Sequence, residues 1–141
     1  HIKGANKYVS LCASTDLKSS PQSGWLYYRF GRIGAVELEF PGTPMRSAQR
    51  FQFFHYSRSG LESTELTFKN IGYTYSLFSN AGHDGDSAEG DLLEGLRITG
   101  QRGAGTQTLL CRSKAFSNWT LIEGAVPCDE ESELNACTYK P

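Results

Sequence analysis

Hydrophobic and polar residues alternate along much of this chain, with a period of two residues. Side chains of a β-strand point alternately to the two faces of a sheet, so this period is typical of strands that bury one face. In residues 65–69, for example, Leu66 and Phe68 are expected on one face and Thr67 and Lys69 on the other. The pattern predicts strands over residues 8–12, 25–30, 35–40, 51–56, 65–69, 73–78, 95–99 and 106–111, with a further short strand over 119–122.

Short turns that contain glycine join neighbouring predicted strands. Residues 31–34, 70–72 and 100–105 each separate two strands by a few positions, which favours antiparallel hairpins. Residues 41–44 contain two prolines and end the strand before them, because proline has no N–H to donate to a sheet. No long segment has the 3.6-residue period of a helix. We therefore predict an all-β fold, an antiparallel β-sandwich or small barrel of about eight strands.

The chain length sets the expected number of domains. With 141 residues the chain suits one hydrophobic core, and we predict a single β domain over residues 1–141. Residues 124–141 are expected to form a short acidic tail closed by a disulfide. Pro127 precedes a predicted helical turn over residues 129–135, because proline is favoured at the first position of a helix.

The four cysteines are Cys12, Cys111, Cys128 and Cys137. An even number in a small domain favours two disulfides, and the spacing lacks the Cys-x-x-Cys pairs of zinc ribbons and thioredoxins. Three pairings are possible. We favour Cys128–Cys137, which closes a short loop, with Cys12–Cys111, which ties the first strand to a late one. Since disulfides are rare in reducing compartments, this predicts a periplasmic or secreted protein; four free thiols in a cytosolic protein are the alternative.

Charge and hydropathy limit the classes of partner. The formal net charge is -1, whereas a protein that binds nucleic-acid phosphates usually carries a basic excess, so we expect no nucleic acid. No apolar run approaches the ~20 residues that span a bilayer, so we expect no membrane span. We recognise no cofactor motif and expect no cofactor.

Residues 82–91 are the most unusual stretch of the sequence. Five acidic side chains and no basic one lie between Asp84 and Glu94. The stretch suits a solvated loop, a polar finger that enters a basic cleft of a partner protein, or a Ca²⁺ site. Asp84 and Asp86 fit the Ca²⁺-loop pattern, but Ala88 replaces the third ligand, and we predict no metal site. The candidate partner-binding residues are His83, Asp84, Asp86, Ser87, Glu89 and Asp91.

Few residues in the sequence point to catalysis. His55 lies in an aromatic-rich strand and His83 in the acidic stretch, and no Gly-x-Ser-x-Gly or His-Glu-x-x-His motif is present. We expect His55 to be a half-buried strand residue and the protein not to be an enzyme. Trp25, Tyr27 and Tyr73 form a second candidate surface, because aromatic rings combine an apolar body with a polar edge.

Several segments resemble small exported proteobacterial proteins. They are Val9-Ser-Leu-Cys-Ala-Ser14, Leu26-Tyr-Tyr-Arg-Phe-Gly31, Val36-Glu-Leu-Glu-Phe-Pro41, Leu66-Thr-Phe-Lys-Asn-Ile-Gly-Tyr-Thr-Tyr75 and Val126-Pro-Cys-Asp129. The resemblance spans most of the chain and implies export and an all-β fold more than an activity.

A looser similarity connects the chain to periplasmic lysozyme inhibitors and to immunity proteins of interbacterial toxin systems. It rests on Ser23-Gly24-Trp-Leu-Tyr27 and Ser59-Gly60, since the inhibitor families insert a Ser-Gly-containing loop into a catalytic cleft. The similarity implies a small disulfide-bonded β domain that blocks a cell-wall hydrolase.

These observations lead to one functional expectation and one alternative. We expect a periplasmic inhibitor or immunity protein that occludes the active site of a cell-wall hydrolase or secreted toxin, with the acidic stretch facing the basic or catalytic groups of that partner. The alternative is an envelope module that binds a small ligand or glycan through Trp25, Tyr27 and Tyr73.

Overall fold

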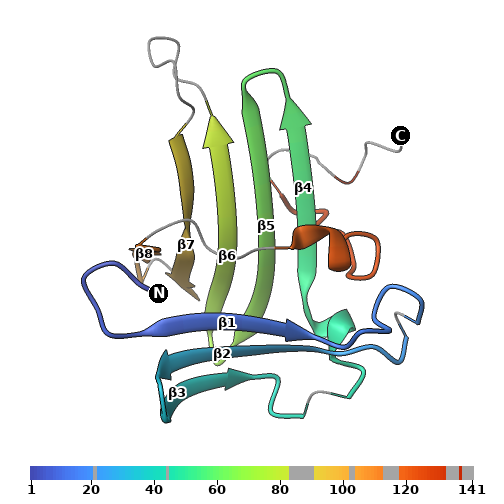
Figure 1. Cartoon of the computed structure of the whole chain (residues 1–141), viewed down its shortest axis with the longest axis horizontal. Coiled ribbons are helices and arrows are strands. Elements are labelled where there is room, and N and C mark those ends of the chain that lie inside the picture. Colours follow the sequence, from blue (N-terminus) through green and yellow to red (C-terminus); the bar gives the residue numbers. More distant parts are fainter. Residues whose placement is uncertain are drawn as a thin grey trace.

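The computed structural model describes residues 1–20, 22–43, 45–82, 91–101, 104–112, 118–132 and 137. These residues form two antiparallel β-sheets, one of three strands and one of five (Figure 1). The strands are β1 (Tyr8–Ala13), β2 (Leu26–Arg32), β3 (Ala35–Phe40), β4 (Gln52–Arg58), β5 (Leu61–Asn70), β6 (Tyr73–Gly82), β7 (Asp91–Gly100) and β8 (Thr106–Leu110). The all-β fold and the eight strands predicted from the sequence are confirmed.

Both sheets follow the order of the sequence. The small sheet has the order β1-β2-β3 and the large sheet the order β4-β5-β6-β7-β8, so each is a meander of antiparallel neighbours. The small sheet runs crosswise over one face of the large sheet, near the end that holds the β5–β6 turn (Figure 1). The other end of the large sheet therefore extends well beyond the small sheet.

The inner face of the large sheet carries rows of side chains that cross all five strands. One row contains Phe53, Leu66, Leu77, Leu96 and Leu109, which are paired one with the next through the strand register. All five belong to the hydrophobic core or pack against it. The alternation of apolar and polar residues places these side chains on one face, as the sequence pattern predicts.

Phe68 of β5 joins the two sheets. Its ring stacks on Phe40 of β3 with 4.3 Å between the ring centroids, and it lies 4.8 Å from the ring of Tyr28 of β2. It also contacts Phe51, just before β4, and Tyr75 of β6. Because buried aromatic rings contribute large apolar areas, this cluster is the main connection between the crossed layers.

The segment after residue 118 wraps around the edge of β4. Ile122, Ala125 and Val126 are buried in the core. The Phe53 N–H then donates to the Pro127 carbonyl at 2.9 Å, and the Asp129 N–H donates to the Phe53 carbonyl at 3.0 Å. Phe53 and Cys128 thus form an isolated parallel bridge that covers part of an edge strand.

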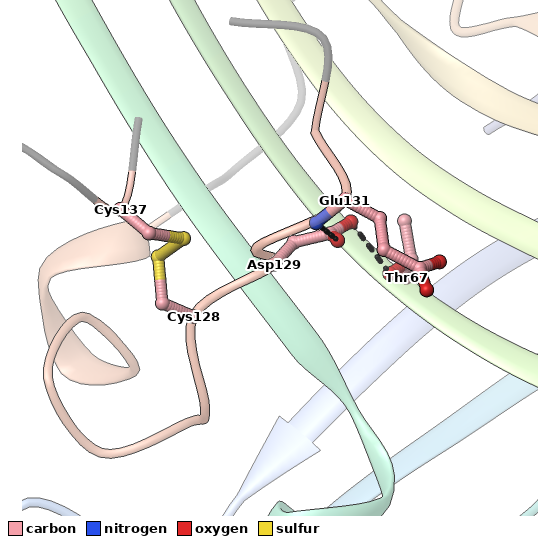
Figure 2. The surroundings of a disulfide bond; sticks show 5 residues. All are labelled: Thr67, Cys128, Asp129, Glu131 and Cys137. Atoms are coloured by element: carbon pink, nitrogen blue, oxygen red, sulfur yellow. Dashed lines mark hydrogen bonds between the residues drawn. A yellow bond between two sulfur atoms is a disulfide. The ribbon is translucent and has the colours of Figure 1, made fainter. Parts of the chain in front are cut away.

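Beyond this bridge the chain reaches the outer face of the large sheet (Figure 2). The Thr67 hydroxyl donates to an oxygen of Asp129 at 3.4 Å, and Lys69 pairs with Glu131 at 3.7 Å. Both β5 residues lie on the face opposite Leu66, as the alternation predicts. Cys128 and Cys137 form the predicted disulfide beside the β4 edge.

One local prediction is wrong, one short element was not predicted, and one further prediction is only partly covered by the described residues. Residues 119–122 are not a strand: Trp119–Leu121 form a short 3₁₀ helix, η3. A second 3₁₀ helix, η1 (Ser47–Arg50), was not predicted. Of the helical turn expected over 129–135, residues 129–132 are not helical and 133–136 lie outside the described residues. Three or four residues are too few for a periodic pattern to separate such a turn from a strand.

Candidate ligand-binding pocket

A cavity of about 430 Å³ lies between β1, the inner face of the large sheet and η3. Its size falls within the range of small-molecule sites, which is about 300–1,000 Å³. Most of its lining is apolar. The lining side chains discussed below are Val9, Leu11, Ala13, Leu77, Glu94, Cys111, Asn118, Trp119, Leu121 and Ile122.

Strand β1 supplies one wall through its alternation. Val9, Leu11 and Ala13 turn inward and pack against the core, whereas Tyr8 and Cys12 are exposed. The inward side chains of this wall are therefore aliphatic, and Ser10 between them also lines the cavity.

The floor combines apolar and polar groups of the large sheet. Next to the row that contains Leu77, two residues away along each strand, the same face of the large sheet holds Thr64, Ser79 and Glu94. Cys111 follows β8 and is hydrogen-bonded to Glu94 through the backbone. Glu94 is only 9% exposed, and the Ser79 hydroxyl donates to its Oε1 at 3.4 Å. An acidic group thus stands at the inner end of a largely apolar cavity.

Cys111 is a free thiol at the same end of the cavity. Its backbone N–H donates to the Glu94 carbonyl at 2.8 Å. Burial raises the pKa of the Cys111 thiol; the nearby amino terminus opposes this shift and the Glu94 carboxyl adds to it. Since the thiolate is the reactive form, Cys111 is a poor nucleophile at neutral pH.

The second wall comes from η3 and its flanking residues. The Trp119 ring stacks near Phe53, with 6.1 Å between the ring centroids, and Ile122 is buried below it. The indole Nε1 of Trp119 is buried, and no described residue accepts a hydrogen bond from it. Such a group is uncommon in a folded protein, because an N–H shielded from water normally finds an acceptor.

His55 fastens this wall to the sheet. Its Nδ1 lies 3.4 Å from an oxygen of Glu123, two residues after η3, and its Nε2 lies 3.3 Å from Glu62 of β5. His55 therefore links the segment after η3 to the neighbouring strand β5 through these two carboxylates. His55 is an exposed residue of β4, although only 33% of its side chain is accessible, so it is less buried than the sequence analysis expected.

The arrangement suits binding through apolar contact with a small number of polar anchors. Aliphatic side chains and one indole provide the walls, while Glu94 offers acceptor oxygens. Among the described residues, no group of three or more His, Cys, Asp or Glu side chains is placed to hold a metal ion.

The acidic stretch singled out in the sequence lies largely outside the described residues. His83, Asp84, Asp86, Ser87 and Glu89 fall in the range 83–90, and Asp91 is the first residue of β7. The stretch connects the ends of β6 and β7 that lie away from the small sheet (Figure 1). Its role in binding stays a prediction.

The three aromatic candidates do not line the cavity, and they lie on two different sheets. Trp25 precedes β2 and is half-buried, and Tyr73, at the start of β6 in the large sheet, is 46% exposed. Tyr27 lies on β2 and points away from the core, because its neighbour Tyr28 is fully buried. The Tyr27 hydroxyl donates to Glu39 at 2.8 Å, which raises the pKa of Tyr27, and Arg29 lies 4.8 Å from its ring.

The predicted Cys12–Cys111 disulfide is wrong in this structure. Both residues are free thiols. Cys12 occupies an outward position of β1, whereas Cys111 faces the cavity together with the inward residues Leu11 and Ala13. The two thiols therefore lie on opposite sides of β1, and the two-residue period of the strand already implies this separation.

The cavity itself was missed by the sequence analysis. Its walls are contributed by β1, β6, β7 and η3, which are far apart along the chain. The one local indication is Glu94, an acidic residue at a position where the alternation of β7 predicts an inward side chain beside Leu96. A charged residue at an inward position marks a candidate site, because burying it is costly without a partner.

Comparisons with known proteins found no matching family, no similar curated protein and no similar solved structure. Within the part of the chain that the structure describes, no helix is long and apolar enough to cross a membrane.

Proposed function

We propose that this protein is a binding module of an oxidising compartment, such as the bacterial periplasm, that takes a small and mainly apolar ligand without chemical conversion. The observation that carries the proposal is the cavity of about 430 Å³ between β1, the large sheet and η3. The Cys128–Cys137 disulfide supports the compartment, since such bonds persist where the surroundings are oxidising.

The two free thiols provide a direct test. Cys111 lines the cavity and Cys12 is exposed on the opposite side of β1, so Cys12 serves as an internal control. A neutral apolar fluorescent probe, N-phenyl-1-naphthylamine, is expected to slow alkylation of Cys111 by iodoacetamide severalfold and to leave Cys12 unchanged. Peptide mass spectrometry measures both rates. Equal rates with and without the probe, across a range of probe sizes, would refute the proposal.

A matched pair of substitutions tests the position of the site. Ala13→Leu adds bulk inside the cavity, whereas Ala35→Leu adds the same side chain at an exposed position of β3. Probe affinity is expected to fall about tenfold or more for Ala13→Leu, since filled space excludes the ligand, and to stay constant for Ala35→Leu. Thermal unfolding of both variants establishes that each is folded.

A second candidate function is inhibition of a protein partner through the acidic stretch 83–91. The observation that favours it is that the ends of β6 and β7 which this stretch joins lie away from the small sheet (Figure 1). In this proposal the acidic side chains meet the basic or catalytic groups of a cell-wall hydrolase or secreted toxin, and complementary charge raises the association rate.

A pull-down from envelope and culture-supernatant proteins tests the second candidate. The expected result is one enriched cell-wall hydrolase or toxin that the purified protein inhibits. Replacing Asp84 and Asp86 together by alanine is expected to weaken that complex and to make its association less sensitive to salt. Unchanged inhibition by the double variant would rule out the acidic stretch as the contact site.

A further inference from the structure

Two hairpin turns of this protein have the same sequence at their tips. Ile33-Gly34 joins β2 to β3, and Ile71-Gly72 joins β5 to β6. Both turns lie at the end of the molecule where the small sheet crosses the large one (Figure 1). Ile71 is 89% exposed and Ile33 is 83% exposed, the two highest values among the large apolar side chains that the structure describes. One end of the protein therefore presents two aliphatic side chains to its surroundings.

Ile71 adopts a backbone conformation that isoleucine disfavours. Its φ is 44°, in the left-handed region, and that of Gly72 is 77°. Two consecutive positive φ angles are typical of the tight hairpin turn that prefers Asn-Gly. A β-branched residue rarely adopts this region, because its side chain crowds the backbone. Since the side chain is exposed, packing within the protein does not offset this strain, and strain at such a position indicates a role in function.

The cations beside the two tips favour a negatively charged partner. Arg32 directly precedes Ile33 and is exposed. Lys69 lies two residues before Ile71 and reaches Glu131 at 3.7 Å, but 66% of the Lys69 side chain stays accessible. Each aliphatic tip therefore has an accessible positive charge close to it in the chain.

Acidic side chains near the two turns are few, and those of the small sheet are paired. The sequence contains no Asp or Glu from residue 66 to 83 or from residue 95 to 122, which include the β5–β6 and β7–β8 turns. In the small sheet, Glu37 pairs with Lys7 at 2.6 Å and Glu39 pairs with Arg29 at 3.3 Å. The acidic stretch 83–91 joins strand ends that lie away from the small sheet (Figure 1). The charge of the molecule thus allows this end to approach an anionic surface.

We propose that this end of the protein docks on the surface of an anionic phospholipid bilayer. Ile33 and Ile71 enter the outermost part of the lipid layer, while the cation before each turn contacts the head groups. Buried apolar area and attraction to anionic lipids together determine the strength of such surface binding. Tyr73, 46% exposed and two residues after Ile71, suits the interface, because its ring combines an apolar body with a polar hydroxyl. This inference goes beyond ligand binding and does not depend on the cavity.

Sedimentation with lipid vesicles tests the proposal. The purified protein with its disulfide intact is expected to sediment with vesicles of phosphatidylcholine and phosphatidylglycerol in equal parts, and more weakly with phosphatidylcholine alone. Added salt should weaken binding to the anionic vesicles, because it screens the attraction between charges. Ile33→Asn and Ile71→Asn are each expected to lower the partition coefficient about tenfold, since burial of one isoleucine contributes roughly that factor.

Leu93→Asn is the matched control for these variants. Leu93 is 51% exposed and is the third residue of β7, close to the strand end that lies away from the small sheet (Figure 1). The substitution removes a comparable apolar side chain outside the proposed contact and should leave the partition coefficient unchanged.

Thermal unfolding separates a role in binding from a role in folding. Ile71→Asn is expected to raise the unfolding midpoint by about 3–6 °C, because asparagine tolerates a positive φ far better than isoleucine does. A variant that is more stable but binds vesicles less tightly would show that Ile71 serves binding and not folding.

Three outcomes would overturn the inference. One is that neither kind of vesicle binds the protein, and a second is that both asparagine variants bind as tightly as the unmodified protein. Equal binding to the two kinds of vesicle would overturn the assignment of an anionic surface. If no vesicle binds while Ile71→Asn still raises the unfolding midpoint, Ile71 belongs instead to a contact with another protein.

Discussion

Tyr28 of β2 brings a hydroxyl group into the core. The side chain is fully buried and packs against Phe68 and Tyr75, and its hydroxyl has no hydrogen-bond partner within the described part of the chain. Burial, with a smaller contribution from Tyr75, raises the pKa of Tyr28 well above its ordinary value. The folded protein therefore holds this proton more tightly than the unfolded chain does.

This difference predicts a loss of stability in alkali. A group whose pKa is raised on folding contributes its full stability below the unfolded pKa of about 10, and loses it as the pH rises above that value. The free energy of unfolding in urea is expected to fall between about pH 9 and pH 11. Tyr28→Phe should unfold with an equal or higher midpoint near neutral pH and show a smaller alkaline loss. An alkaline loss as large as that of the unmodified protein would show that Tyr28 is not its source.

Gly95 of β7 permits a close approach of two neighbouring strands. A Cβ atom at this position would collide with the Leu109 carbonyl of β8 and lie 3.0 Å from the Phe78 ring of β6. The Phe78 ring therefore occupies space that a side chain at residue 95 would need. Arg97 lies over the same ring and pairs with Glu65 at 3.4 Å.

Gly95→Ala is expected to lower the free energy of unfolding by about 1–3 kcal/mol, because backbone cannot move aside as a flexible side chain can. Gly42→Ala is the control, since a Cβ atom there meets nothing within 4 Å. Its effect is expected to stay within about 0.5 kcal/mol. Urea unfolding of both variants measures the difference, and equal values would contradict the packing described around Phe78.

Individual inward and outward positions were predictable where a strand was long enough to show its period. Leu66 and Phe68 are buried and Lys69 is exposed, as expected, and Thr67 lies on the opposite face from Leu66. The Cys12–Cys111 prediction is wrong because it considers only positions along the chain and not the faces on which the two side chains lie. The polar end of the pocket was not predicted, since Glu94, Cys111 and Trp119 meet only through packing of distant segments.

At the scale of elements, the segment 118–132 depends on its attachment to the β4 edge. The backbone bonds of Phe53 with Pro127 and Asp129 hold it there, and the Cys128–Cys137 disulfide lies directly beside them. The same segment supplies η3 and hence one wall of the cavity. Stability of the tail and occupancy of the pocket are therefore expected to be coupled.

The disulfide tests this coupling. Replacing Cys128 and Cys137 together by serine is expected to lower the free energy of unfolding by about 2–3 kcal/mol, as for a closed loop of this length. Cys12→Ser is the control and should have little effect, because the thiol is exposed. Hydrogen exchange should rise first at Phe53 and Asp129, whose N–H groups bond across the edge. Unchanged exchange there would mean that the disulfide does not support the edge contact.

Strands were predicted more reliably than short helical turns. Repeated alternation and glycine-containing turns located the core of all eight strands, although β5, β6 and β7 extend several residues beyond the predicted ends. Such ends are set by pairing with a neighbour and not by local sequence. Residues 119–122 have the composition of a strand but find no partner strand, and their inward residue Ile122 is buried through a 3₁₀ turn instead.

At the scale of the whole molecule, one cluster of buried residues includes both sheets and the tail. Leu26, Tyr28 and Phe40 come from the small sheet, Leu66 and Phe68 from the large one, and Ile122 and Val126 from the segment after η3. The small sheet therefore has no separate core to sustain it. Local alternation predicted which residues of each strand face the core. The crossed arrangement of the sheets depends instead on how these residues pack across the interface between the sheets.

A shared core predicts a single cooperative unfolding transition. Far-ultraviolet circular dichroism, which follows the sheets, and tryptophan fluorescence, which follows Trp25 and Trp119, are expected to give the same midpoint in urea. Trp25 immediately precedes β2 of the small sheet and Trp119 lies in η3, so the two residues report on different parts of the molecule. Separate midpoints for the two signals would show that one layer unfolds independently.

The bridge between Phe53 and Cys128 also bears on how the chain reaches this structure during its synthesis. Ribosomes release a chain from its amino end, so β4 and β5 emerge about sixty residues or more before the segment that covers the β4 edge. During that interval the edge offers unpaired backbone groups to any neighbouring nascent chain. Association between incomplete chains therefore competes most strongly with folding when many chains are synthesised at once. Slower translation of residues 59–127 would prolong the time for which the β4 edge is exposed.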